Sequence, residues 1–456
     1  MQAIASSYRD PSGFVFENGG KFYRYIAPQY FGDYEMLMES GLYKALRDAN
    51  RLVAHEEVTN TTAFTLMPDQ QGKIILPEQI PFISYPYEWS FDMWRDAALV
   101  TLKIASAALE KNMVLKDATP FNIQFFNGRP VFIDTLSFEQ YATGTPWVAY
   151  RQFCECFLGP LLLMHYGHRD MGKLFLAYPE GIPLEVIKSL LPLKAKWNIH
   201  VYMHIFLQEK IAGKKKNEKE MQREFSKAKL ALLIRGLENF VSGLKPKSNR
   251  SAWDDYYTDT VLGADYLAAK EKAVRALADE AEFNTVLDLG ANDGLFSLLL
   301  KDKAEYIIAT DADSNCINAL YKITRLQKIK NILPLVSALH TPSPAIGWAN
   351  AERTSLTQRL KADLVLALAL VHHLAISNNL PLDHIAQRLQ GMGEWLIIEF
   401  VPKSDVKTQQ LLASREDIFH NYSYEKFKES FAQKFDILRE DNIGDSGRII
   451  FLMKRK

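Results

Sequence analysis

The stretch Val286-Leu-Asp-Leu-Gly290-Ala-Asn292-Asp-Gly294-Leu-Phe296 decides the fold of the C-terminal half of this 456-residue chain. A short apolar run ends at a glycine turn, and a helical pattern follows at once. Such a strand–turn–helix unit leaves backbone N–H groups and a helix N-terminus facing a crevice. A dinucleotide fingerprint would need G-x-G-x-x-G, and Asn292 stands where its second glycine would be. We therefore expect a ligand that carries a carboxylate rather than a pyrophosphate.

Strand and helix patterns alternate around this stretch. Short apolar runs predict strands at 285–289, 306–310, 332–336, 363–370 and 395–400, with helices at 266–281, 296–301 and 316–327. This alternation is typical of a parallel sheet with helices on both faces. Two more runs, at 435–440 and 448–453, flank a glycine turn and predict a hairpin. The expected fold class is α/β, a doubly wound Rossmann-like sheet with an antiparallel C-terminal hairpin.

A second acidic residue supports a ribose-bearing ligand. Asp311 ends the second expected strand, 21 residues after Gly290. A carboxylate at this place can accept hydrogen bonds from both hydroxyls of a ribose.

The two motifs together resemble the class I S-adenosylmethionine (SAM) dependent methyltransferases. The resemblance implies that Asp288, Gly290, Asn292 and Gly294 surround the methionine part of SAM and that Asp311 holds its ribose. The family often has an acidic residue near the adenine amine after the third strand. This chain has Ser337 there, and we count it among the expected cofactor-binding residues.

Several residues are candidates for the acceptor side of the site. His372 and His373 end the fourth expected strand, and either imidazole could act as general base for a hydroxyl nucleophile. The alternative is that they cap the strand or pack beneath a loop. Glu399 ends the fifth strand, where it could line the acceptor pocket or pair with Lys403. Tyr257 could cover the sulfonium with its ring or belong to a packed aromatic lid.

A wider resemblance covers residues 250–456 and extends to the N-terminal half. The stretches DLVLALALVHHLAI, EWLIIEFVPKSD and LLASREDIF are similar to a bacterial group of class I methyltransferases, some named in rhizobia as host-specificity nodulation proteins. The resemblance implies SAM-dependent methylation of an unknown acceptor, with a hydroxyl of a saccharide or small metabolite as the preferred candidate.

The N-terminal half carries a constellation that resembles the kinase-like phosphotransferases. Asp117 and Asn122 have the D-x4-N spacing of a catalytic base and a metal-binding amide, and Asp134 follows where a second metal ligand is expected. Arg24 stands where a strand lysine is usual, and no glycine-rich phosphate loop is evident. The alternatives are a Mg-ATP site that makes the protein a bifunctional kinase–methyltransferase, and a non-catalytic module that binds the acceptor or a protein partner. A third is a scaffold in which Asp117 and Asn122 only shape a turn.

Composition and charge set the remaining expectations. The chain has 54 basic and 54 acidic residues and thus no net charge, so nucleic acid is not an expected partner. Three cysteines, no secretory signal and no long apolar stretch favour a cytoplasmic protein without a membrane span. Apart from the Mg-ATP alternative, no residues are assigned to a metal site. The expected domains are 1–205, an α+β kinase-like domain; 206–250, a basic helical linker; and 251–456, the methyltransferase domain.

Overall fold

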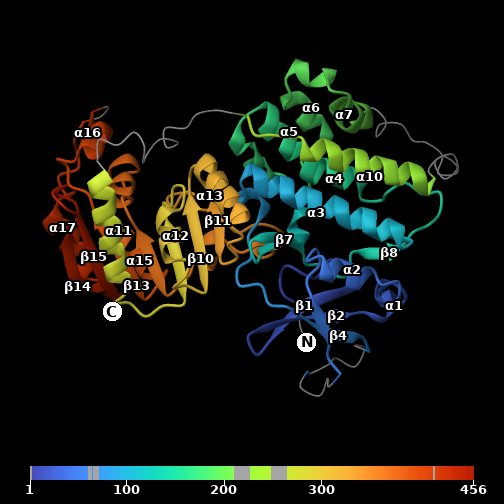
Figure 1. Ribbon diagram of the computed structural model, residues 1–456, viewed down its shortest axis with the longest axis horizontal. Coiled ribbons are helices and arrows are strands. Elements are labelled where there is room, and N and C mark those ends of the chain that lie inside the picture. Colours follow the sequence, from blue (N-terminus) through green and yellow to red (C-terminus); the bar gives the residue numbers. More distant parts are fainter. Residues whose placement is uncertain (1–2, 60–63, 65–70, 210–225, 248–263, 414–415) are drawn as a thin grey trace. The chain divides into compact units, whose positions relative to one another are not determined.

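The computed structural model describes residues 3–59, 64, 71–209, 226–247, 264–413 and 416–456. The chain forms two compact units (Figure 1). Unit 1 comprises Met1–Asn249 and Ala345–Thr354, and unit 2 comprises Arg250–Pro344 and Ser355–Lys456. Unit 1 is therefore discontinuous in sequence.

Unit 2 is built on a seven-stranded sheet in the order β11-β10-β9-β12-β13-β15-β14. The strands are β9 (Thr285–Leu289), β10 (Tyr306–Asp311), β11 (Ile332–Val336), β12 (Leu364–Ala367), β13 (Trp395–Phe400), β14 (Phe435–Asn442) and β15 (Ile449–Arg455). The first five are parallel, while β15 is antiparallel to both β13 and β14. The predicted mixed α/β sheet, with its antiparallel hairpin, is confirmed.

Helices cover both faces of this sheet. They are α11 (Ala264–Ala278), α12 (Leu295–Leu300), α13 (Ser314–Leu326), α14 (Leu356–Arg359), α15 (Leu382–Gln390), α16 (Val406–Leu412) and α17 (Tyr424–Ala432). Figure 1 shows α11 lying across one face, where Val274 and Leu277 join the core formed with the strands. Strands β11 and β13 are buried along their whole length. Strands covered on both faces have apolar residues at successive positions, which is the pattern these two strands largely show.

The topology of unit 2 positions a site. From β9 the chain builds outward through β10 and β11 on one side, then returns to place β12 on the other. The loops that leave β9 and β12 thus diverge at their carboxyl ends. In open α/β sheets, ligands bind in the crevice at this switch point.

Unit 1 begins with a four-stranded antiparallel sheet and continues mainly as helices. The sheet, in the order β1-β2-β4-β3, contains β1 (Gly13–Asn18), β2 (Lys21–Ile26), β3 (His55–Glu57) and β4 (Lys73–Pro77). Two small sheets pair β5 (Met113–Leu115) with β8 (Phe138–Gln140) and β6 (Ile123–Phe126) with β7 (Arg129–Phe132). The α-helices are α1 (Phe31–Glu39), α2 (Leu42–Asp48), α3 (Phe91–Glu110), α4 (Tyr150–Phe153), α5 (Gly159–Tyr166), α6 (Leu184–Leu190), α7 (Ile199–Val201) and α10 (Lys227–Ser242). This order agrees with the kinase-like expectation, which stays a prediction.

Helix α10 lies within the stretch that the sequence assigns to a linker. Its residues Leu230, Ile234, Leu237 and Val241 are buried, and the helix runs beside α3 (Figure 1). The apolar spacing of three and four residues explains this packing, because it gives the helix one apolar face. None of the helices in the described residues is long and apolar enough to cross a membrane.

Candidate functional site

A cavity of about 390 Å³ lies in unit 1 and another of about 330 Å³ in unit 2. The unit 2 cavity opens at the carboxyl ends of β9 to β12, as the switch-point rule requires. Its lining includes most of the residues expected at a cofactor site: Asp288, Gly290, Asn292, Asp311, Ser337 and His373. Gly294 lies nearby without lining it, and Tyr257 lies outside the described residues.

The turn after β9 has an unusual backbone that glycine and asparagine permit. Gly290 has φ +72° and Asn292 has φ +52°, both in the left-handed region. Gly294, at φ +85°, begins α12, and a Cβ there would lie 2.4 Å from Leu320 Cδ1. Gly294 therefore allows α12 and α13 to approach closely. Ala369, which follows β12 and also lines the cavity, has φ +50°. Strained non-glycine residues of this kind gather at functional sites.

A buried carboxylate, Asp288, and a half-buried one, Asp311, face this cavity, and neither has an ion pair among the described residues. Asp288 accepts a hydrogen bond from the hydroxyl of Ser297 at 2.7 Å, and burial raises its pKa to about 6. Asp311 accepts from the backbone N–H groups of Asn292 (2.9 Å) and Asp313 (2.8 Å), and burial raises its pKa as well. A carboxylate offers about four acceptor positions, so Asp311 keeps acceptor capacity for a ligand.

Lys270 of α11 also lines the cavity, and the sequence analysis missed it. Its side chain is almost completely buried, with Nζ 2.6 Å from Oε2 of Glu399 and 5.0 Å from the ring centroid of Phe296. Burial lowers the pKa of Lys270, although Glu399 opposes that shift. A weak signal was present: Lys270 lies on a helical stretch that precedes the first strand, but nothing in the spacing pointed it inward.

Glu399 lies beneath the cavity and does not line it. It accepts hydrogen bonds from Tyr266 (2.9 Å) and Arg448 (3.2 Å) besides its ion pair with Lys270. Burial alone would raise the pKa of Glu399, but Lys270 and Arg448 outweigh it and lower the pKa. Its expected alternative partner, Lys403, instead pairs with Asp417 at 2.8 Å. Glu399 is thus part of a buried ionic network.

Arg448 is the other cation of that network. Its guanidinium donates to both carboxylate oxygens of Asp405, at 2.8 and 3.1 Å, and only 1% of its side chain is exposed. Burial opposes its charge, but the hydrogen bonds to Asp405 and the charge of Glu399 raise its pKa overall. The network fixes α11, β13 and β15 to one another beneath the cavity.

The two histidines after β12 differ in position. His373 lines the cavity, whereas His372 is fully buried and does not line it, and neither of its ring nitrogens has a hydrogen-bond partner among the described residues. Burial lowers the pKa of His373 to about 4 and that of His372 further. Both are therefore neutral at neutral pH. A π-helical turn, His373–Ser377, begins here, and such turns are frequent at functional sites.

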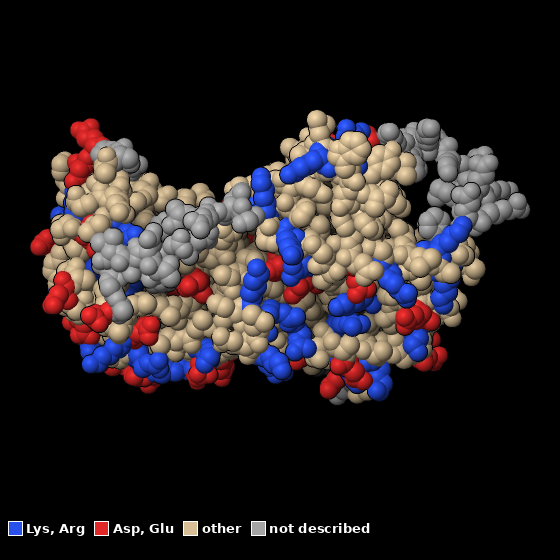
Figure 2. Space-filling view, turned by 45° about the horizontal axis from the view of Figure 1, so that its top comes forward, with Lys and Arg blue, Asp and Glu red and all other residues tan. Residues whose placement is uncertain are grey.

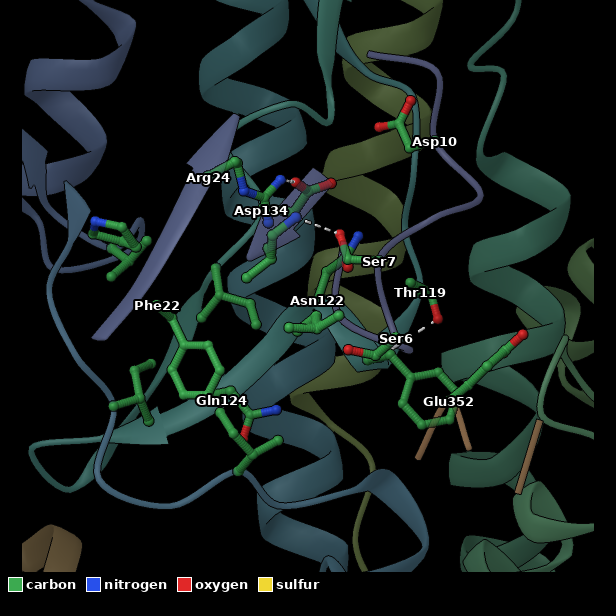
Figure 3. A pocket seen from close by; sticks show the side chains of 18 of the residues that line it. Ser6, Ser7, Asp10, Phe22, Arg24, Thr119, Asn122, Gln124, Asp134 and Glu352 are labelled. Carbon is green, nitrogen blue, oxygen red and sulfur yellow. Dashed lines mark hydrogen bonds and ion pairs between the residues drawn. The ribbon is translucent and has the colours of Figure 1, made fainter. Parts of the chain in front are cut away.

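The unit 1 cavity brings together the three residues expected at a phosphotransfer site. Asp117, Asn122 and Asp134 all line it, and the Nδ2 of Asn122 donates to Asp117 at 3.1 Å. Figure 3 shows Arg24 of β2 directed at Asp134, to which it donates a hydrogen bond. Burial raises the pKa of Asp117. It opposes the charge of Asp134 too, but Arg24 and Ser137 outweigh it and lower that pKa.

Two segments that the sequence analysis did not assign complete this cavity. Residues 6–10 line it, and this segment lies beside β1, because the Val15 N–H donates to the Ser7 hydroxyl oxygen at 2.8 Å. Glu352 and Arg353, from the part of unit 1 that follows β11 in sequence, line it too. Figure 3 shows Glu352 among the lining side chains. The Arg353 guanidinium lies 4.4 Å from the ring centroid of Phe121 and has no carboxylate partner among the described residues.

Comparisons with known proteins come from sequence and from structure. No model of a known protein family matches the chain. The N-methyltransferase NodS from Bradyrhizobium japonicum WM9 is 10% identical, with a TM-score of 0.32 over 43% of this chain and 99% of its own. The bifunctional kinase-methyltransferase WbdD is 19% identical, with a TM-score of 0.28 over 42% of this chain and 38% of its own. These TM-scores are too low to establish a shared fold.

The sequence relationship is much stronger. Nodulation protein NoeA of Rhizobium meliloti strain 1021 is 33% identical over 463 residues, which span 99% of this chain and 96% of that protein. Identity at this level across nearly the whole of both proteins shows common descent of both units. The chain belongs to the family of nodulation protein NoeA.

Proposed function

We propose that unit 2 is a SAM-dependent methyltransferase. One observation carries the proposal: Asp288, Gly290, Asn292, Asp311 and Ser337, chosen from sequence for a SAM site, line one cavity at the switch point of the sheet. The donor set fits the ligand, because the cavity offers carboxylates for an ammonium group and for ribose hydroxyls, and a lysine for a carboxylate.

Each charged lining residue has a distinct part in binding. The free acceptor positions of Asp311 hold the two ribose hydroxyls, and Asp288 accepts from the ammonium of the methionine part. Lys270, which lines the cavity, donates a hydrogen bond to the methionine carboxylate while it keeps its ion pair with Glu399. Ser337, after β11, lies at the end where the adenine would be recognised.

The chemistry needs alignment and proton removal more than activation. When bound, SAM supplies a methyl group on a sulfonium, which is already reactive toward a nucleophile. Neutral His373 accepts the proton of an acceptor hydroxyl, while the walls of the cavity exclude water and fix the line of attack. His372 is too deeply buried to reach the acceptor directly, so His373 is the base in this proposal.

A hydroxyl of a saccharide or a small metabolite is the proposed acceptor. The relationship to a nodulation protein supports this choice, together with the absence of net charge that would attract nucleic acid. Cytoplasmic location and the domain limits expected from the sequence remain part of the proposal.

Binding calorimetry tests the cofactor. The full chain should bind SAM and S-adenosylhomocysteine and give no heat with NAD. Asp311→Ala should weaken SAM binding by about a hundredfold, since two hydrogen bonds to a charged group are lost. Asp302→Ala is the matched control, because that carboxylate is exposed on the same unit. Tight binding of NAD without binding of SAM would refute the proposal.

Phosphoryl transfer by unit 1 is a second candidate, favoured by the convergence of Asp117, Asn122 and Asp134 on one cavity. Carboxylate and amide oxygens are suitable ligands for Mg²⁺, so the donor set fits a Mg-nucleotide. Asp117 would accept the proton of the acceptor hydroxyl, and Arg353 is a cation free to contact a phosphate. The ion pair between Arg24 and Asp134 favours the alternative, a binding module without catalysis.

Thermal shift distinguishes these two. A nucleotide site predicts that Mg-ATP raises the Tm of the full chain, that Asp134→Asn abolishes the shift, and that the variant still binds SAM. Asp48→Asn serves as control, because Asp48 is an exposed carboxylate on α2. If Mg-ATP does not change the Tm of the unsubstituted protein, unit 1 is a non-catalytic binding module.

A further inference from the structure

Large apolar side chains are concentrated on the surface of one short stretch of unit 1. Of the seventeen such side chains exposed in the described residues, seven lie between residues 190 and 207. We call them the 190–207 patch: Leu190, Leu193, Trp197, Ile199, Tyr202, Met203 and Leu207. Trp197 is 91% exposed and Leu193 is 79% exposed. A concentration of this kind marks an interaction surface.

The exposed residues of the patch are distinct from the residues that form the local hydrophobic core. The same stretch buries a separate set of side chains, among them Ala195, Val201, Ile205 and Phe206. Lys188 of α6 pairs with Glu209 at 2.9 Å, which ties the two ends of the stretch together. The stretch is therefore folded and anchored, and its outward apolar residues are additional to those that hold it.

The Asp, Glu, Lys and Arg content of the stretch that carries the patch is wholly basic. Residues 186–208 contain no Asp or Glu, while Lys194 and Lys196 are exposed. In Figure 2 the surface over α6 and α7 is largely tan with blue side chains beside it. Apolar and aromatic side chains interspersed with lysines are the composition of surfaces that lie in the headgroup region of anionic membranes.

We propose that the 190–207 patch docks on the surface of an anionic lipid bilayer. Trp197, Leu193 and Ile199 would enter the boundary between headgroups and acyl chains, and Lys194 and Lys196 would meet lipid phosphates. Docking would bring the protein to acceptors that gather at a membrane. The proposal does not depend on the methyltransferase or phosphotransfer proposals.

A second copy of the chain fits the patch less well. Lysine is depleted in protein–protein interfaces, because its desolvation opposes burial. At a bilayer the same lysines keep their ammonium groups in the wet headgroup layer while their stems lie along the apolar surface. The two lysines within the patch thus favour the membrane over a dimer.

Vesicle flotation with the full chain tests the proposal. The protein should float with vesicles of phosphatidylcholine mixed with phosphatidylglycerol, and less with phosphatidylcholine alone. The double variant Leu193→Ser/Trp197→Ser should lower binding by about tenfold or more, because two large apolar side chains no longer leave water. Lys194→Glu/Lys196→Glu should lose the preference for the anionic vesicles.

The matched control is Leu232→Ser/Trp348→Ser, which removes a leucine and a tryptophan of similar exposure (66% and 73%) outside the patch. It should float like the unsubstituted protein. All positions are exposed, and circular dichroism checks that each variant is folded. Failure of the unsubstituted protein to float, or equal flotation of all variants, overturns the proposal. So does gel filtration that shows a dimer dissociated by Leu193→Ser/Trp197→Ser, which would assign the patch to a second copy.

Discussion

The two cavities hold their carboxylates in different ways. In unit 2, Asp288 and Asp311 receive hydrogen bonds from a hydroxyl and from backbone N–H groups, and among the described residues neither has an ion pair. In unit 1, Asp134 is already paired with Arg24. Negative charge in the unit 2 cavity is thus available to a cationic ligand, whereas in unit 1 a cation of the protein has taken part of it.

The difference extends to where each unit keeps its ion pairs. Unit 2 places the pair of Arg448 and Glu399 outside the cavity lining, where both side chains are almost wholly buried. In unit 1 the pair of Arg24 and Asp134 lies in the cavity itself, with 13% of each side chain exposed. Buried pairs are costly to break, and pairs reached by solvent much less so. The comparison therefore predicts an order of effects.

The largest expected effect is from Arg448→Ala. It leaves the buried Asp405 without a cation and Glu399 with Lys270 alone, and we expect a loss of about 3–5 kcal/mol in the free energy of unfolding. Urea denaturation measures it. Arg439→Ala, which removes an exposed arginine paired with Glu280 and Asp441, should cost less than about 1 kcal/mol. Equal losses would show that the network does not hold unit 2 together.

Gly294→Ala should follow, at about 3 kcal/mol. The substitution forces a side chain into the left-handed region and into Leu320, so strain and overpacking add. Gly20→Ala in unit 1 separates the two causes, because Gly20 has φ +75° with open space around it. It should cost only about 1 kcal/mol. A larger loss at Gly20 than at Gly294 would contradict the account of the α12–α13 approach.

Arg24→Ala is expected to cost about 2 kcal/mol, less than Arg448→Ala, because solvent partly replaces the lost partner of Asp134. The same denaturation series measures it. Arg47→Ala, at an exposed pair with Asp48, is the control and should be nearly neutral. A loss as large as that of Arg448→Ala would erase the proposed contrast between the two cavities.

The smallest effect expected is on the pH dependence of SAM affinity. Asp288 is ionised above its pKa of about 6 and accepts from the ammonium group, whereas below it the neutral acid attracts the ligand less. Affinity should therefore fall as pH decreases, by up to about tenfold, or about 1.4 kcal/mol, per pH unit below 6. Calorimetry across this range measures it, and Asp288→Asn should flatten the profile. A profile that rises toward acid pH would exclude this part for Asp288.

Strand-end reasoning predicted much of the unit 2 site. Asp288, Asp311 and Ser337 each follow or end a strand of one parallel sheet, so their convergence required only the order of the strands. The place of Lys270 in the cavity was not predicted, because it depends on how α11 packs against the sheet. The periodicity of the sequence does not specify that packing. Glu399 likewise could be placed at a strand end, but its partner Arg448 immediately precedes β15, an antiparallel neighbour that joins the sheet much later in the chain.

Unit 1 was less predictable, for a different reason. The spacing of Asp117, Asn122 and Asp134 is local, and the cavity brings them together as expected. The rest of the lining comes from segments distant in sequence. Residues 6–10 have no glycine-rich pattern that would mark them as part of a nucleotide site, and Glu352 lies more than 200 residues after Asp134. The sequence analysis assigned α10 to a linker because lysines are frequent in and before this helix. Its opposite face carries Leu230 and Leu237, which are buried.

The segment Ala345–Thr354 limits how the two units can be expressed separately. Within unit 1, Glu352 accepts hydrogen bonds from Tyr8 (2.5 Å) and Arg9 (2.7 Å), and the Thr354 N–H donates to Tyr85 (3.1 Å). No single cut of the reading frame can separate the two units intact, because a break near residue 249 would send this segment away with the wrong half. A unit 1 expressed as residues 1–249 would therefore lack Glu352 and its hydrogen bonds with Tyr8 and Arg9.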